Sequence, residues 1–330
     1  MSTHFPDAAM MRTALTLAIR APSVHNVQPW QWRVGSDSVH LYADPTRHLV
    51  HTDPDRRDLL VSCGATLHHC VVALAALGWQ SRIRRFPNPA EPLHLAAIEL
   101  RRHAANDVDV ALAAAIPRRR TDRRYFSSWP VSHGDITVMG VRAARMGVVM
   151  RRLEPTSELR ATLAEAVWQH AIDQDYLNEL TVWSGRHAAT AGVPARNTPV
   201  SDPNSPIPGR LFAGTALAQP PDASASADGG VLLALGTTAD DDLARLRAGE
   251  ASSLVLLTAT ALGLASCPVT EPLEIPETRD SIRADSFDDD SFPQMLLRVG
   301  WAPVNADPLL PTPRRPLDEV VSRLDGLRLG

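Results

Sequence analysis

Two long segments rich in alanine and leucine set the strongest limit on how this 330-residue chain can fold. They read SCGATLHHCVVALAALGW from residue 62 and ASSLVLLTATALGLASCP from residue 251. Both predict long buried helices, because the runs are apolar and each carries Ala-Leu-Gly before a turn. Alanine- and leucine-rich runs coincide easily, so an internal duplication and two unrelated core helices both remain open.

Each long helix lies within its own set of predicted elements. In the first set we expect helices over 8–20 and 53–78 and strands over 31–34, 39–43, 81–86 and 93–100. In the second set we expect helices over 108–116, from Ser132, over 156–185, 241–263 and 317–324, and strands over 148–153, 231–235 and 295–299. The pattern predicts an α+β fold in two halves, residues 1–106 and 107–330.

The basic residues are all arginine. The chain has 33 of them and no lysine, against 37 acidic residues, which gives a net charge of -4. P-loop, kinase and Schiff-base sites are excluded because each depends on a lysine. Any bound anion is therefore held by guanidinium or backbone N–H groups. The negative net charge argues against a nucleic-acid binder or a membrane-surface protein.

The cysteines and the N-terminus bear on the compartment. Three cysteines are too few for a disulfide framework, and Cys63 and Cys70 sit seven apart on one predicted helix face, which favours core packing over a metal site. The first residues lack the pattern of a signal peptide, and we expect no apolar run of membrane-spanning length. We expect a cytoplasmic protein. No G-x-S-x-G elbow is present, which disfavours a hydrolase.

An arginine-rich run follows the predicted helix over 108–116. It reads PRRRTDRRYF from Pro117, with five arginines in seven positions. Such a run is commonly a solvated face. It also suits a phosphate, which Arg and Thr side chains bind together. Nucleic acid is a third alternative, but no basic stripe elsewhere supports it.

Three further segments are candidates for ligand contact. The loop APSVHNVQPWQW from Ala21 places Ser, His, Asn and Gln side chains between two prolines, where either a turn or a planar polar ligand explains them. GLASCPVTEP from Gly263 leaves a helix in extended form, with backbone N–H groups free. PTPRRPLDEV from Pro311 puts two arginines at the start of the last helix.

Residues 191–230 hold seven prolines and little periodicity. A loop of this length inside a compact domain is commonly a lid or a disordered insert. Its apolar residues, including Leu211, Phe212 and Leu217, favour a lid that packs on the rest of the protein.

In order and spacing, four segments together resemble the FMN-binding nitroreductase family, and within it the internally duplicated Acg-type branch. The family's R-R-S-x-R-x-F pattern is similar to RRTDRRY from Arg119, and its P-S-x-x-N-x-Q-P-W pattern to PSVHNVQPW from Pro22. A-L-G-L-x-S-x-P is matched by ALGLASCP from Ala261, and R-x-P-L-E-E by RRPLDE from Arg314.

The resemblance implies a role for each matched position. Arg119 and Thr121 would hold the FMN phosphate, joined by Arg314 or Arg315, and Arg123 would lie at the N1/O2 edge of the flavin. Backbone N–H groups of Thr270 and Glu271 would approach N5 and O4. The remaining cofactor-binding candidates are Ser23, His25, Asn26 and Gln28 on the opposite side of the ring, and Pro268 and Val269.

Ordinary nitroreductases are homodimers whose flavin sites use both chains. Here the serine–asparagine loop and the arginine motif fall in different halves, so we expect a monomer that acts as an intramolecular pseudo-dimer with one FMN site. A second site would lack an arginine clamp, since only Arg12 and Arg20 are available near residues 8–20.

Three functions remain open. The first is an NAD(P)H-dependent reductase of nitroaromatic or quinone compounds, with hydride transfer through flavin N5. The second is a protein that stores or sequesters FMN under a closed lid. Three features favour this function. Glu271 stands in a turn that usually contains glycine in the family, and Thr312 stands where the family has a lysine that binds the phosphate. The third feature is the 191–230 insertion. The third function is an interaction module without flavin.

Overall fold

The computed structural model describes residues 5–185, 189–202, 205, 207–221 and 223–325. Its helices are α1 (Ala8–Ala18), α2 (Arg57–Ala76), α3 (Asp107–Ala115), α4 (His133–Arg145), α5 (Ser157–Ile172), α6 (Gln174–Trp183), α7 (Asp242–Ala261), α8 (Glu271–Glu274), α9 (Pro276–Phe287) and α10 (Leu317–Val320). Its strands are β1 (Trp30–Val34), β2 (Ser38–Ala43), β3 (Trp79–Arg85), β4 (His94–Arg102), β5 (Val149–Leu153), β6 (Val231–Thr237), β7 (Ala265–Val269), β8 (Phe292–Gly300) and β9 (Val321–Arg323).

The strands form two sheets with matching internal order. One runs β3-β4-β2-β1-β9 and the other β5-β6-β8-β7, so that β3-β4-β2-β1 corresponds to β7-β8-β6-β5. All pairs within these two sets of four are antiparallel, and the register shifts once in each, beside Leu41 in β2 and Leu235 in β6. The last strand, β9, runs parallel to β1 and so brings the end of the chain onto the first sheet.

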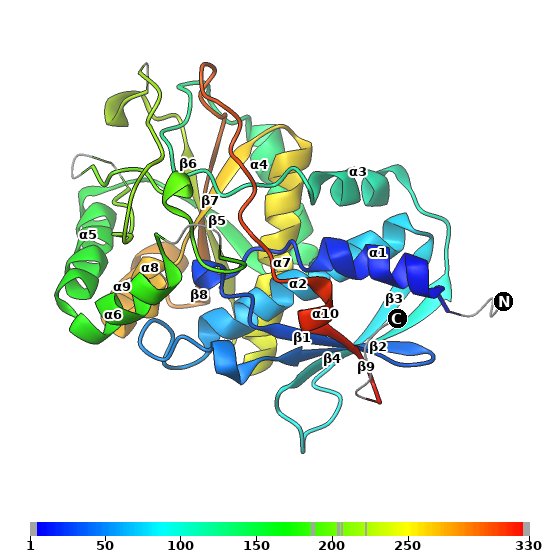
Figure 1. The fold of residues 1–330 in the computed structure, drawn as a ribbon. Coiled ribbons are helices and arrows are strands. Elements are labelled where there is room, and N and C mark those ends of the chain that lie inside the picture. Colours follow the sequence, from blue (N-terminus) through cyan, green and yellow to red (C-terminus); the bar gives the residue numbers. More distant parts are fainter. Residues whose placement is uncertain (1–4, 186–188, 203–204, 206, 222, 326–330) are drawn as a thin grey trace.

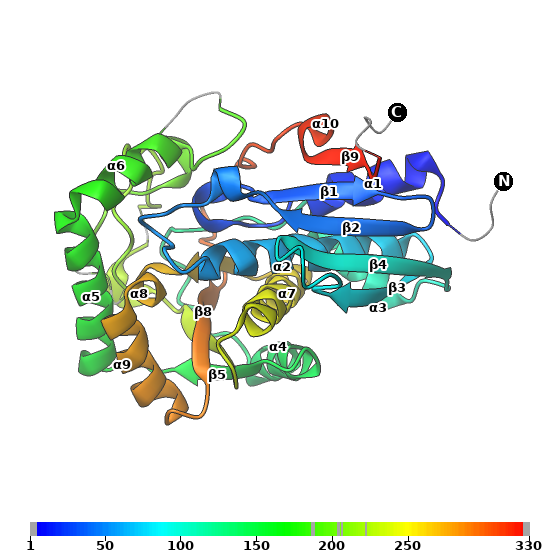
Figure 2. The same cartoon turned by 90° about the horizontal axis from the view of Figure 1, so that it is seen from below.

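Helices α2 and α7 pack side by side at the centre of the molecule, between the two sheets (Figures 1 and 2). Both contain 20 residues and both end at a glycine with positive φ, Gly78 and Gly263. The prediction of two long buried helices is confirmed. α2 has the length and hydropathy of a membrane-spanning helix, contrary to our expectation, but 83% of its apolar window is buried inside the protein.

Helices cover one face of the first sheet and both faces of the second, and the burial pattern along the strands differs accordingly. Among the described residues the first sheet packs on α1 and α2 through one face, and β2 alternates between buried and half-buried residues. The second packs on α4 and α7 through one face and on α5, α8 and α9 through the other. Every residue of β6 is therefore buried, as expected for a strand covered on both sides.

The structure corrects three of the predicted elements. The helix expected over 156–185 is two helices, because the Asp173 carboxylate caps the backbone N–H groups of Asp175 and Tyr176 and starts α6. Residues 321–323 are the strand β9 rather than the end of a helix. Residues 265–269 are extended as expected, but they form the edge strand β7, whose backbone groups pair with β8 along one side.

Candidate functional site

A cavity of about 170 Å³ lies where residues of the two predicted halves meet. Its walls come from the loop after α1, one side of α2 and α7, the arginine-rich run, the 191–230 segment and the strand β7. Of the predicted site residues, those in the wall are Ser23, His25, Thr121, Arg123, Pro268, Val269, Thr270 and Glu271.

A second, smaller pocket adjoins this cavity at Thr121, which lines both. Its wall includes the guanidinium groups of Arg20, Arg119, Arg120 and Arg314. Arg20 follows α1 and Arg314 lies on the chain that returns to β9, so residues far apart in sequence build the pocket. We call these four arginines and Thr121 the arginine pocket.

The arginine pocket is a buried positive site whose nearest charges are positive as well. Nε and Nη1 of Arg119 and Nε of Arg314 are buried without a hydrogen-bond acceptor among the described residues. Burial and the neighbouring arginines lower the pKa of Arg314 to about 9 and that of Arg119 to about 10. Unmatched buried donors and mutual repulsion are what an anion bound here would relieve.

Three predicted residues lie beside the cavity and make protein contacts. Asn26 donates through Nδ2 to Gly192 O (3.0 Å), and Gln28 accepts from the Arg315 N–H (2.8 Å). The Arg315 guanidinium reaches the Asp44 carboxylate at 3.4 Å, so of the two arginines offered for the phosphate only Arg314 lies in the arginine pocket. A contact of these three side chains with FMN stays a prediction.

Arg123 and Glu271, the residues predicted to lie at the edges of the flavin ring, both contact other parts of the protein. Arg123 donates from Nη1 to Asn197 O (3.2 Å), and its Cζ lies 4.8 Å from the centre of the Phe212 ring. The Glu271 carboxylate is 3.2 Å from Nδ1 of His170 on α5, so its charge is directed at that imidazole. Thr312 lines the arginine pocket, where the family's lysine would fall.

Sequence reasoning missed a cluster centred on Arg210, a residue of the 191–230 segment. Its side chain is 9% exposed, and its guanidinium contacts the side chains of Tyr176, Glu274, His25 and Thr270. One signal was available, because Arg210 is the only basic residue between 197 and 230. Arg20 was also missed as part of the clamp, although it stands two residues before the Pro22 motif.

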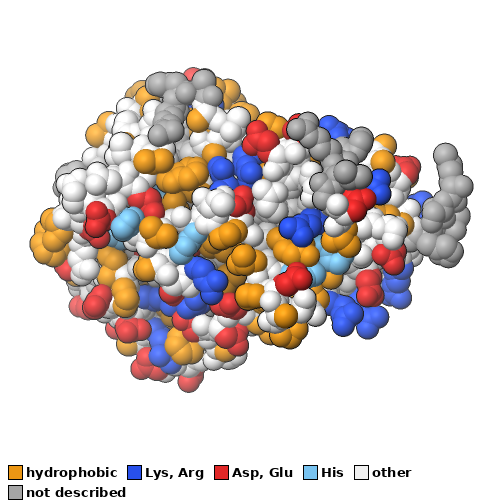
Figure 3. All heavy atoms as spheres, turned by 60° about the horizontal axis from the view of Figure 1, so that its bottom comes forward, with side chains coloured by type: hydrophobic (Ala, Val, Ile, Leu, Met, Phe, Trp, Pro, Cys, Tyr) orange, Lys and Arg blue, Asp and Glu red, His pale blue; other side chains and the backbone are white. Residues whose placement is uncertain are grey.

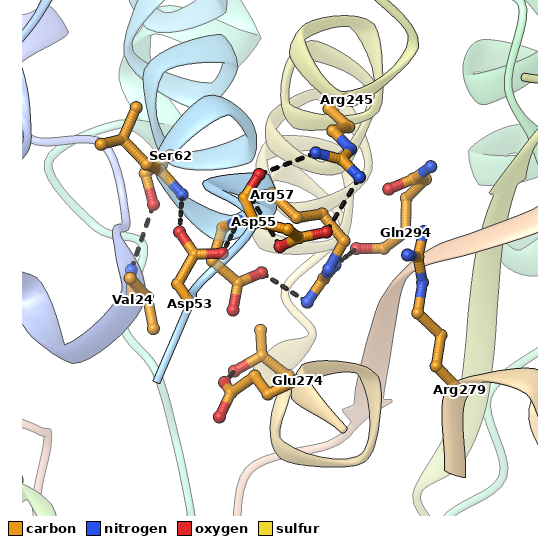
Figure 4. A network of polar contacts seen from close by, with 12 residues as sticks. Val24, Asp53, Asp55, Arg57, Ser62, Arg245, Glu274, Arg279 and Gln294 are labelled. Carbon is orange, nitrogen blue, oxygen red and sulfur yellow. Dashed lines mark hydrogen bonds and ion pairs between the residues drawn. The ribbon is translucent and has the colours of Figure 1, made fainter. Parts of the chain in front are cut away.

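A network of polar groups supports the cavity wall at the start of α2 (Figure 4). The Asp53 carboxylate accepts from the N–H groups of Asp58 and Leu59, both at 2.8 Å, and Arg57 donates to Gln294 O at 2.7 Å. Val24 donates to Ser62 Oγ at 3.2 Å, which ties the loop after α1 to α2. The network ties the loop that carries His25 to α2, and α2 to β8 of the second sheet.

Acidic and basic side chains alternate over the face drawn in Figure 3, and they are interspersed with apolar ones. The positive charge of the arginine pocket is mostly internal, since Arg119 is buried and Arg20, Arg120 and Arg314 are half-buried. One explanation of the arginine-rich run from Pro117 is that its side chains face solvent. This is true of Arg118, which is exposed, but not of Arg119, which is buried.

Comparisons with known proteins give close relatives. Over 321 residues the chain is 61% identical to "Putative NAD(P)H nitroreductase Rv3131" of Mycobacterium tuberculosis. Over 317 residues it is 35% identical to "Putative NAD(P)H nitroreductase acg" of the same organism. These alignments cover 97% and 94% of this chain, and 93% and 95% of the relatives.

Among solved structures the similarity is more distant. The FMN-dependent nitroreductase NfnB of Mycobacterium smegmatis in complex with NADPH is 17% identical, covering 64% of this chain and 97% of its own, with a TM-score of 0.40. A nitroreductase with bound FMN from Bacteroides fragilis is 15% identical over 62% of this chain and 92% of its own, also at 0.40.

No protein-family model matches the chain, so the assignment rests on the sequence relatives. Their identity and their coverage of nearly the whole length confirm the resemblance drawn from the four motifs. The chain belongs to the nitroreductase family.

Proposed function

We propose that this protein binds one FMN in the cavity and acts as an NAD(P)H-dependent reductase of nitro or quinone compounds. The observation that carries the proposal is the arginine pocket at the end of a cavity lined by the predicted flavin-contacting residues. A phosphate dianion would supply the acceptor that the buried nitrogens of Arg119 and Arg314 lack. The residues present therefore fit FMN.

The chain's own residues would divide the work of binding. Arg20, Arg119 and Arg314 hold the phosphate, and Thr121 joins the arginine pocket to the cavity. Arg123 places a fixed cation in the cavity wall, which stabilises negative charge on a reduced ring. When bound, FMN would accept a hydride from NAD(P)H at N5 and pass reducing equivalents to the acceptor.

We further propose that the chain is an intramolecular pseudo-dimer with halves at 1–106 and 107–330. The matching order of the two sheets supports this, as does the equal length of α2 and α7. Arg20 and the loop with Ser23 and His25 come from the first half, whereas Arg119 and Thr121 come from the second. One site would thus use both halves.

A second candidate function is FMN storage, and the 191–230 segment favours it. Described residues of this segment, among them Pro199, Phe212 and Gln219, line the cavity, and Arg210 anchors the segment to α6 and α8. A segment that stays in this position would restrict the alternation of NAD(P)H and acceptor that turnover needs. FMN would then be bound without being used.

Absorption spectroscopy separates the two functions. The purified protein is loaded with FMN under anaerobic conditions and treated with NADPH or NADH, and then with the quinone menadione. The reductase proposal expects NAD(P)H to bleach the flavin and menadione to restore its absorbance. Bleaching by dithionite but by neither nucleotide would overturn the reductase and support storage. A protein that takes up no FMN would overturn both.

A further inference from the structure

The guanidinium of Arg210 contacts two residues of the cavity wall, His25 and Thr270, and two residues outside the wall, Tyr176 and Glu274. Its Nη1 lies 3.1 Å from Nε2 of His25 and 2.6 Å from the Tyr176 hydroxyl. Its Nη2 lies 3.1 Å from Thr270 Oγ1 and pairs with the fully buried carboxylate of Glu274. The guanidinium is therefore held in place by its ion pair, independently of His25.

The contact between Arg210 and His25 determines where the imidazole carries its proton. A guanidinium has N–H donors and no acceptor, so Nε2 of His25 must accept through its lone pair. The proton of the neutral ring then sits on Nδ1. A second proton, on Nε2, would point at the arginine. Burial and Arg210 lower the pKa of His25 to about 3.

The Nδ1–H group of His25 has no acceptor among the residues that the structure describes. The ring lines the cavity, and its edge packs on Phe212, with ring centres 6.3 Å apart and planes at 85°. Nδ1 is not among the buried atoms that lack a partner, so it is open to the cavity, where a ligand can accept from this N–H.

We propose that Arg210 is a positioning residue that fixes His25 as the neutral Nδ1–H tautomer, so that His25 donates a hydrogen bond to an oxygen of the planar ligand in the cavity. The ligand half of this proposal rests on the proposed function, since the acceptor is a carbonyl of FMN or the oxygen of a quinone or nitro compound. A neutral donor suits such an oxygen because it binds without losing its proton.

Several charges act on His25, and together they keep it neutral. Arg210, Arg123 and His170 lower its pKa, whereas Glu274 raises it. Tyr176 is the other titratable group of the Arg210 cluster, and the remaining ones among the described residues of the cavity wall are Asp58, Tyr125, Asp202, Cys267, Glu271 and Arg298. The wild-type ring is therefore expected to hold one tautomer from pH 8 down to pH 5.

The tautomer can be measured in the FMN-free protein by long-range ¹H–¹⁵N NMR of the histidine rings, with His25→Gln identifying the signal. We expect a protonated Nδ1 and an unprotonated Nε2 that do not titrate between pH 8 and 5. The double variant Arg210→Met/Glu274→Gln removes the donor without leaving a buried carboxylate unpaired, and it should let Nε2 take the proton and raise the pKa toward 6.5. Arg196→Met, an exposed arginine of the same segment, is the matched control and should change neither.

Two results would overturn the tautomer assignment: a wild-type ring protonated at Nε2 or titrating near pH 6.5, and a double variant that keeps the wild-type spectrum. Addition of FMN, followed by menadione, then identifies the acceptor. A shift of the His25 Nδ1–H signal with FMN assigns a flavin oxygen, and a shift with menadione alone assigns the substrate.

Bound FMN, detected by its fluorescence, with no shift at either step would refute the donor role. Failure of FMN to bind would refute the proposed function together with this ligand role. The tautomer assignment would still be decided by the spectrum of the FMN-free protein.

Discussion

Gly64 of α2 and Gly249 of α7 face each other at the crossing of the two central helices, and their surroundings are reciprocal. A Cβ on Gly64 would lie 2.0 Å from Leu246 O, and a Cβ on Gly249 would lie 2.0 Å from Val61 O. Each carbonyl stands three residues before the opposite glycine. Helices this close tolerate only hydrogen at these positions, and the cavity wall on α2 and α7 depends on their approach.

Alanine at either glycine should push α2 and α7 apart. We expect Gly64→Ala and Gly249→Ala each to lower the free energy of unfolding by roughly 1–3 kcal/mol or more, because the contacted atoms are backbone. Chemical denaturation measures this. Gly134→Ala is the matched control, since its Cβ would meet nothing closer than 3.7 Å. Two variants as stable as the wild type would contradict the close crossing.

Arg119 should destabilise the protein when no anion is bound. Replacement with methionine removes a buried charge that has arginine neighbours, so Arg119→Met should stabilise the FMN-free protein by about 1–2 kcal/mol while weakening FMN binding. Thermal unfolding with and without FMN tests both effects. The exposed Arg118, whose Nε donates to Ala114 O, offers a control that should alter neither. A loss of stability in FMN-free Arg119→Met would show that its charge is balanced within the protein.

His68 should make the fold sensitive to acid. It is buried between α2 and α7, with Nδ1 2.8 Å from Ser253 Oγ, and burial lowers its pKa from 6.5 to about 4. Its stabilising contribution is complete above pH 6.5 and is lost as the pH falls toward 4, at a cost of about 3 kcal/mol. Denaturation at pH 7 and pH 4 should show a smaller acid loss for His68→Gln than for the wild type. The exposed His133→Gln should match the wild type, and an equal loss in all three proteins would refute the assignment.

Asp58 should make the fold less stable as the pH rises, whereas His68 makes it less stable as the pH falls. Burial in the cavity wall raises its pKa from 3.8 to about 7, with Glu274 adding to the shift and Arg57 opposing it. Its contribution is complete below pH 4 and is lost as the pH rises through 7, by on the order of a few kcal/mol. Asp58→Asn should therefore gain stability relative to the wild type between pH 4 and pH 7.5, in denaturation curves. A constant difference across this range would contradict the raised pKa.

Local sequence signals were sufficient for most of the fold, and the motifs were sufficient for much of the lining of the candidate cavity. Apolar periodicity predicted the long central helices, and the capping residue Ser132 predicted the start of α4, because these signals act within a few residues. The motif residues from Pro22 and from Arg119 do meet, as the resemblance implied.

The contributions of Arg20 and Arg210 could not be predicted in the same way. Arg20 meets Arg119 and Arg314 only in three dimensions, where Arg314 Nη2 donates to Arg20 O (2.9 Å). Arg210 lies in a segment without periodicity, and its partners Tyr176 and Glu274 are on helices whose bounds were not predicted. The strand β9 was also missed, because four residues of helix give no sign that pairing with β1 follows.

The central claim is that the arginine pocket holds the phosphate of FMN, and comparison with riboflavin, which lacks that phosphate, tests it most directly. Calorimetric titration of the FMN-free protein should give an affinity for FMN at least about 100-fold higher than for riboflavin, since two charge-assisted contacts contribute roughly 1.5–3 kcal/mol each. The Arg119→Met/Arg314→Met variant should lose most of this preference and keep its affinity for riboflavin. Equal affinities of the wild-type protein for the two flavins would contradict the account.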